Sequence, residues 1–534
     1  MPERSIIQWD KDDLDAMGLL KVDVLALGML SAIRRCLALV SQHRGQLFQM
    51  QDIPADDPAT FEMICQADTV GVFQIESRAQ ISMLPRLQPR CFYDLVIEVA
   101  IVRPGPIQGG MVHPYLKARE HPDQVSYASP ALKEALKRTL GVPIFQEQVM
   151  QVAMAAADFT PGEADQLRRS MAAWKRKGGV HKFYDRLVGG MLKNGYTAEF
   201  AEQLFKQIEG FGEYGFPESH AASFALLTYV SCWLKWHEPA CFLAAMLNSQ
   251  PLGFYAPSQL VQDAKAHGVQ VLPVDVLHSH WDCTLEAAAT SGQKAQPTVR
   301  LGLRMVAGLA ESMARRIVTA KQQTPFTNTQ DLALRASLDA GDLNVLASAD
   351  ALKGLSGHRR QQVWDAIALH HAPLLLREAP VNEAHLALPR AAEGEEVIND
   401  YAAVGLTLRA HPLLLLRHKL SNLKLMTAAQ LHTLPNGRLA RACGIVTMRQ
   451  RPGTAKGVTF VTLEDETGTV NVIVWKTLAE RQRAELLHAR LLVVHGTWQR
   501  DEGSGGQVCH LIAGFLRDLT PLLGGLATQS REFH

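Results

Sequence analysis

The chain has 534 residues, of which 47% are hydrophobic and 20% are charged, enough for roughly three or four domains with buried cores. The formal net charge of +1 excludes a protein that binds polyanions through overall charge, so a nucleic-acid surface must be a local patch. The eight cysteines form no CxxC pair, so we expect reduced thiols. No apolar run is long enough to span a bilayer, so we expect a cytoplasmic protein with no membrane partner.

The first predicted element is a buried strand within GLLKVDVLALG (18–28). Side chains alternate along a strand, so Lys21 and Asp23 share one face, opposite Leu20, Val22 and Val24. A Lys and an Asp on one face form either a local ion pair or a site for phosphate and metal. Helical spacing of apolar residues follows up to Gly45, which predicts strand, tight turn and helix.

A rigid loop is predicted in the segment VRPGPIQGG (102–110). Pro104 and Pro106 remove backbone donors and the glycines open the backbone, so neither a helix nor a central strand fits. The loop carries Arg103, which suits an anionic ligand, although many Pro-Gly loops are only turns.

A helix is predicted to begin at Thr160, Pro161 and Glu163, which supply a cap hydroxyl, a first-turn proline and a carboxylate three residues on. Arg168 and Arg169 lie opposite its apolar stripe, and more basic residues follow at 175–177. This face is either a solvated cationic surface or a phosphate-binding surface, because Arg forks match phosphate oxygens in pairs.

The next segment, GFGEYGFPESHAASF (210–224), alternates glycine with aromatic residues and runs into a helix. Planar rings and His220 beside a helix N-terminus suit stacking on a base or sugar. An ordinary flexible loop explains the same composition.

Several sequence blocks together resemble one family, the alpha subunit of bacterial DNA polymerase III, and within it the error-prone form used in damage-induced mutagenesis. The resemblance covers about residues 5 to 520 and rests on these blocks: GLLKVDVLALGML, GVFQIESR, VRPGPIQGGMV, PIFQEQVMQVA, ADQLRRSM and YGFPESHAASFALLTYVSCWLKWHEPA.

The resemblance implies a role for Asp23 as the third carboxylate of the palm, which helps hold two Mg²⁺ ions. Lys21 would lie close to the triphosphate of the incoming dNTP, together with Arg103, Arg168, Arg169 and His220. The family's first two carboxylates belong to an upstream strand that we do not find in this sequence. We therefore expect a C-terminal portion of a DNA-directed DNA polymerase, with doubtful activity alone. A non-catalytic DNA-binding module, or the remnant of a truncated or split gene, stays as the alternative.

Two helix-hairpin-helix motifs are predicted at 301–318 and 346–363. In the first, Gly308 lies in the turn; in the second, Gly354, Arg359 and Arg360 would contact DNA. Such hairpins direct backbone amides at phosphates without reading sequence. An ordinary helical pair is the alternative.

The end of the chain predicts an OB-fold, with five strands between 437 and 520 and a short helix at 477–488. Arg449, Arg451, Lys456, Phe460 and Trp475 could supply charge and stacking for single-stranded DNA. OB-folds also bind proteins, so that alternative remains. Replicative members of the family carry a Gln-initiated sliding-clamp motif near the preceding linker, and we find none here. This fits the resemblance to the error-prone form, which implies that a clamp is reached through an adaptor protein of the mutagenesis machinery.

The predicted fold class is a multidomain α+β protein with α-helical fingers, a palm-edge strand, tandem hairpins and a C-terminal β-barrel. The expected domains are a palm edge (1–28), fingers (29–270), hairpin region (271–370), linker and connecting segment (371–436), OB-fold (437–520) and tail (521–534). The expected partners are primer-template DNA, dNTPs and single-stranded DNA, and the expected cofactor is Mg²⁺.

Overall fold

The computed structural model describes most of the chain. The described residues are 9, 11–19, 26–102, 110–172, 183–210, 217–253, 255–287, 296–368, 386–452, 455, 457–528 and 530–533. None of the helices within these ranges combines the length and apolar character that a membrane crossing requires.

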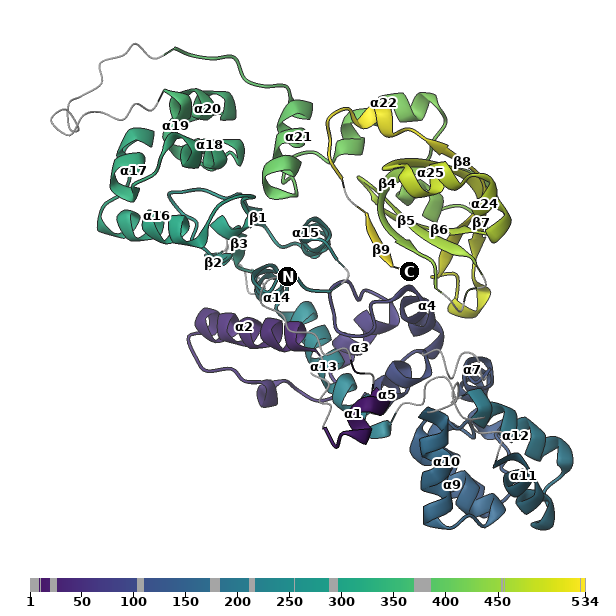
Figure 1. The fold of residues 1–534 in the computed structure, drawn as a ribbon. Coiled ribbons are helices and arrows are strands. Elements are labelled where there is room, and N and C mark those ends of the chain that lie inside the picture. Colours follow the sequence, from purple (N-terminus) through teal and green to yellow (C-terminus); the bar gives the residue numbers. More distant parts are fainter. Residues whose placement is uncertain are drawn as a thin grey trace.

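The first half of the described chain is helical, as predicted for the fingers (Figure 1). Its α-helices are α1 (Lys11–Ala16), α2 (Leu27–Arg44), α3 (Pro58–Cys65), α4 (Arg78–Leu87), α5 (Phe92–Ile101), α7 (Val112–Glu120), α8 (Pro130–Leu136), α9 (Gln146–Ala157), α10 (Pro161–Ala172), α11 (Tyr184–Lys193), α12 (Ala198–Gly210), α13 (Glu218–His237), α14 (Pro239–Asn248) and α15 (Pro257–Ala266). Short 3-10 turns occur at η1 (Met50–Asp52), η2 (Pro122–Gln124) and η3 (Lys137–Thr139).

Helices α5 and α13 pack against each other at the centre of the fingers. Every residue of α5 from Asp94 to Ile101 is buried, which explains why its sequence is almost continuously apolar rather than amphipathic. Helices α10 and α11 both pack on α9, and Figure 1 shows α9 to α12 grouped as a lobe beside this centre.

The hairpin region begins with a small sheet that the sequence analysis did not predict. Its order is β1–β3–β2, with β1 parallel and β2 antiparallel to β3. The elements are β1 (Val271–Leu272), β2 (Thr284–Glu286), β3 (Thr298–Arg300), η5 (Leu303–Met305), α16 (Glu311–Gln323), α17 (Thr329–Ala336), α18 (Ala340–Ser348), α19 (Lys353–Ser356) and α20 (Arg359–Ile367). One hydrophobic cluster extends from Met29 to Leu406, so the fingers and this region share a core.

Three helices then connect the hairpin region to a β-barrel. The elements are α21 (Glu393–Val404), α22 (Pro412–Asn422), α23 (Ala428–His432), β4 (Leu439–Gln450), β5 (Thr459–Asp465), β6 (Gly468–Val474), α24 (Lys476–Arg481), α25 (Arg483–His488), β7 (Leu491–Arg500), η8 (Glu502–Ser504), β8 (Cys509–Asp518), η9 (Thr520–Leu523) and β9 (Arg531–Phe533).

The barrel confirms the predicted OB-fold. The sheet order is β5–β6–β8–β7–β4, and β4 pairs again with β5, which closes the barrel. A register irregularity between Val446 and Met448 lets β4 pair with β7 through its first half and with β5 through its second half, as a bulge at a barrel corner does. The alternating burial of β5 places Phe460 and Thr462 on the outer surface.

Candidate nucleic-acid interface

The predicted phosphate-binding helix is α10, and its start confirms the predicted capping box. The Thr160 amide donates to Oε2 of Glu163 at 2.8 Å, and the Glu163 amide donates to Oγ1 of Thr160 at 3.3 Å. Leu167 faces the core and is fully buried. The helix is therefore oriented by its apolar side, which leaves the arginine side toward solvent.

Arg168 and Arg169 share one carboxylate, that of Asp165. Arg168 donates two hydrogen bonds to Oδ1, at 3.0 and 2.8 Å, and Arg169 donates through Nε to Oδ2 at 2.8 Å. The Arg169 side chain is 74% exposed and that of Arg168 is 40% exposed. Two guanidinium groups are thus held side by side around one anion, at a surface that an external phosphate can reach.

His220 lies on the exposed side of the first turn of α13. This helix start is anchored to the fingers through Glu218, whose amide donates to Oε2 of Glu147 at 3.0 Å and whose carboxylate pairs with Arg138 at 2.8 Å. Glu147 belongs to the first turn of α9, on which α10 packs. Helix α13, which carries His220, and helix α10, which carries the two arginines, therefore both contact α9.

The remaining predicted nucleotide and metal residues, Lys21, Asp23 and Arg103, lie outside the described residues. Within the described ranges, one group has the spacing of metal ligands, namely Asp68, Asp263 and His267. The Lys235 ammonium lies among them, 2.9 Å from a carboxylate oxygen of each aspartate. The ammonium group already occupies the space between the two carboxylates, so these residues do not fit a magnesium ion.

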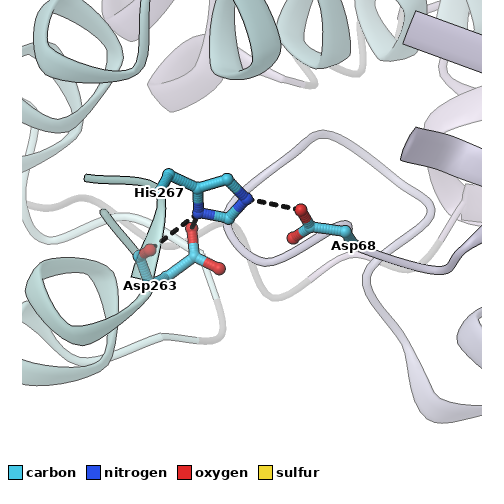
Figure 2. A group of neighbouring side chains, drawn as sticks. All are labelled: Asp68, Asp263 and His267. Atoms are coloured by element: carbon cyan, nitrogen blue, oxygen red, sulfur yellow. Dashed lines mark hydrogen bonds and ion pairs between the residues drawn. The ribbon is translucent and has the colours of Figure 1, made fainter. Parts of the chain in front are cut away.

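The four residues instead form an ion-pair network that braces α13 against α15. His267 contacts two acceptors, with Nε2 2.5 Å from Oδ2 of Asp68 and Nδ1 2.7 Å from the backbone oxygen of Asp263 (Figure 2). Both ring nitrogens must carry a hydrogen to satisfy both acceptors, so the geometry favours the imidazolium form. The network then balances two cations against two carboxylates.

The pKa values follow from this arrangement. The hydrogen bond to Asp68 raises the pKa of His267 above 6.5, although burial opposes the shift. Burial alone would raise the pKa of Asp68, but hydrogen bonds from His267 and Lys235 lower it to about 2. Burial raises the pKa of Asp263. The attraction of Lys235 lowers this pKa, but by less than burial raises it. We conclude that this network is structural.

The first predicted hairpin has its turn at Gly308, where the backbone has a φ of +83° and a Cβ would meet nothing within 4 Å. The glycine therefore serves the left-handed turn rather than close packing. The helix before the turn is only the 3-10 turn η5, and α16 begins after Ala310. The neighbouring Ala307 amide donates to the Ala403 oxygen of α21 at 2.8 Å, so that turn amide is already used within the protein.

The second predicted hairpin requires a correction at Arg359. Its side chain is 4% exposed and donates to Oε2 of Glu396 at 2.6 Å and to a carboxylate oxygen of Asp400. Because this guanidinium is enclosed by carboxylates of α21, the structure contradicts the prediction that it contacts a DNA phosphate. Arg360, by contrast, is 42% exposed and pairs with Glu395 at 2.8 Å, so it remains a candidate.

Gly354 has a packing role in the structure, and its predicted DNA contact stays a prediction. A Cβ at this position would lie 2.6 Å from Cδ1 of Leu277, so the glycine allows α19 to approach the segment after β1. Its absent side chain serves this close packing, which does not require a phosphate contact.

The barrel presents two of its predicted DNA-binding residues at the surface. Trp475 is 53% exposed at the end of β6, and Arg451 is exposed just after β4. Lys456 lies outside the described residues. Arg449 is a correction, because it is buried and donates to the Leu486 oxygen at 2.7 Å. Phe460 is on the outer face of β5 but already contacts Arg78 of α4.

Comparisons with known proteins agree with this order of modules. Residues 29–195 match the finger domain of the bacterial DNA polymerase III alpha subunit, residues 268–362 a helix-hairpin-helix motif, and residues 440–512 an OB-fold nucleic acid binding domain.

Curated relatives match the whole chain. An error-prone DNA polymerase of Bordetella bronchiseptica is 63% identical over 540 residues, which is 100% of this chain and 51% of the relative. One from Alkalilimnicola ehrlichii is 58% identical over 534 residues, again 100% of this chain and 51% of the relative. One from Pseudomonas fluorescens is 58% identical over 535 residues, with the same coverage. The chain thus spans about half the length of these relatives.

Proposed function

Because this chain is homologous to error-prone DNA polymerases along its whole length, we propose that it supplies the fingers, hairpin region and OB-fold of a template-directed, damage-induced DNA polymerase. The observation that carries the proposal is the order of finger, hairpin and OB modules within one continuous similarity. In this role the chain binds the incoming dNTP and the primer-template DNA.

The nucleotide site of this proposal centres on Arg168 and Arg169. Asp165 holds both guanidinium groups close together, and a triphosphate, which carries more charge and more acceptor oxygens than one carboxylate, can replace that anion. The resemblance of the sequence to the family adds three more residues to the proposed nucleotide site, namely His220, Lys21 and Arg103. Asp165 would then act as a counter-ion that keeps the arginines ordered while no nucleotide is bound.

The proposed catalytic residue of the chain is Asp23, as one ligand of the two magnesium ions that the family uses. When bound, such ions activate the primer 3′-hydroxyl and neutralise the pyrophosphate that leaves. One carboxylate is too few for two ions, so we expect that the isolated chain does not extend a primer. Primer extension with Mg²⁺ and four dNTPs checks this, and template-dependent product that Asp23→Asn abolishes would contradict it.

The proposed DNA contacts are independent of sequence. The Gly308 turn and Arg360 would contact phosphates, and Arg451, Lys456 and Trp475 of the barrel would contact single-stranded DNA through charge and stacking. We also propose that a sliding clamp joins the complex through an adaptor protein, since the linker sequence shows no clamp motif of its own.

The nucleotide site is tested best in the complete polymerase by substituting Arg169. Losing one charge-assisted phosphate contact costs ~1.5–3 kcal/mol, so Arg169→Ala should lower kcat/KM for dNTPs roughly tenfold to a hundredfold. Lys137→Ala is the matched control, because Lys137 is also an exposed finger cation paired with a nearby carboxylate, that of Glu134 at 2.6 Å. Equal kinetics for both variants would mean that α10 presents only a solvated cationic face.

A further inference from the structure

Helix α4 of the fingers lies against the outer surface of the barrel, although the two are far apart in sequence. Arg78, at the start of α4, donates to Oγ1 of Thr462 on β5 and has its guanidinium carbon 5.8 Å from the centre of the Phe460 ring. Figure 1 shows α4 near the lower end of the barrel in this view.

The other end of α4 contacts the loop between β7 and β8. The Arg86 guanidinium contacts both carboxylate oxygens of Asp501. Its Nε lies 3.0 Å from Oδ2, and an Nη atom lies 2.9 Å from Oδ1. Asp501 directly precedes η8 in that loop. The helix is thus fixed to the barrel by one arginine near each end.

The surface that α4 covers corresponds to the ligand face of OB-folds in general. Oligonucleotides bind these barrels over the second and third strands and the loops that connect the first two and the last two strands. In this chain the second strand is β5 and the loop before the last barrel strand is residues 501–508. Both elements contact α4, so part of the face is occupied from within the chain.

The electrostatics of this contact make it easy to release. Nε of Arg78 is buried and has no hydrogen-bond partner among the described residues, and burial lowers the pKa of this guanidinium below its ordinary value. A buried cation without a compensating carboxylate is costly. The Arg86–Asp501 pair is partly exposed, at 36% and 30%, and such pairs contribute at most about 1 kcal/mol.

We propose that α4 is an intramolecular competitor for the OB-fold's ligand face, and that single-stranded DNA must displace it to bind there. The proposal rests on the proposed function, in which the barrel binds single-stranded DNA. Displacement frees Arg78 and Arg86 from the barrel, and the oligonucleotide takes their place on β5 and the 501–508 loop.

Charge reversal at Arg86 tests the competition in the full chain, with fluorescence anisotropy of a labelled oligo(dT) as the measurement. Arg86→Glu makes the protein more negative, so simple electrostatics predicts weaker binding. If Arg86→Glu releases α4, the opposite is expected, namely about two- to fivefold tighter binding. This factor corresponds to the loss of one partly exposed ion pair. Arg90→Glu is the matched control, because Arg90 is an exposed arginine in the loop after α4 and should not gain affinity.

A second pair of variants tests whether Arg86 and Asp501 act through their contact, while the sign of the Arg86→Glu effect alone separates release of α4 from a change of net charge. Asp501→Arg should tighten binding, and adding Arg86→Glu to it restores an ion pair of reversed orientation, which should weaken binding again toward the wild-type value. If Arg86→Glu weakens binding as Arg90→Glu does, or if the double variant binds as tightly as Asp501→Arg, the competition is refuted while DNA binding by the barrel stands. If no variant binds oligo(dT), both proposals fail.

Discussion

Two junctions of this molecule are built around arginines, one between the hairpin region and α21 and one between α4 and the barrel. In the first, Arg359 and Arg409 share the carboxylates of Glu396 and Asp400, and Arg409 also pairs with Asp350. In the second, Arg78 meets a hydroxyl and a ring, and Arg86 forms a partly exposed pair. The difference lies in charge compensation and exposure, so we expect the contact of Arg359 to persist more than those of Arg78 and Arg86.

The hairpin junction should lose the most stability when its charge balance is broken. Arg359→Met removes the buried cation between Glu396 and Asp400 and leaves them the partly exposed Arg409, which should cost up to about 3–5 kcal/mol. The measurement is the free energy of local opening of α20 and α21, obtained from native-state hydrogen exchange in the intact chain.

Arg360→Ala is the control for this prediction, because Arg360 is the next residue and its pair with Glu395 is exposed. It should cost about 0–1 kcal/mol. Equal losses for the two variants would show that burial of Arg359 contributes nothing specific, and the contrast between the two junctions would fail.

The network around His267 should show a pH-dependent contribution to stability. The folded pKa of His267 is raised above 6.5, so its contribution is complete below pH 6.5 and disappears as the pH rises through the folded pKa. His267→Gln should therefore lower the Tm more at pH 6 than at pH 9. A Tm difference between wild type and variant that is constant across this range would contradict the imidazolium assignment.

The α4 junction should show the smallest effect on stability. Arg86→Glu removes a pair whose members are 36% and 30% exposed, so it should change the unfolding free energy by at most about 1 kcal/mol. Thermal unfolding of the full chain checks this. A loss as large as that of Arg359→Met would make α4 a fixed structural element rather than a displaceable one.

The sequence predicted those features that depend on neighbouring residues. The capping box at Thr160 and Glu163 and the alternating strands of the barrel are local patterns, and both are confirmed. The small sheet β1–β3–β2 was missed because its strands have only two or three residues each, too few for alternation to be visible.

The candidate site was predicted less completely because exposure depends on distant partners. Arg359 is buried by carboxylates 37 and 41 residues further along the chain, and no local pattern distinguishes it from the exposed Arg360. The partners of Arg78 and Arg86 lie 384 and 415 residues away. The roles of Lys21, Asp23, Arg103 and Lys456 stay predictions.

Hydrogen exchange of the full chain with and without oligo(dT) tests most directly the claim that one junction opens on DNA and the other stays closed. The account predicts faster exchange in peptides of α4 when oligo(dT) is bound, with unchanged exchange in peptides of α20 and α21. Unchanged or slower exchange in α4 while oligo(dT) is bound at the barrel would contradict it.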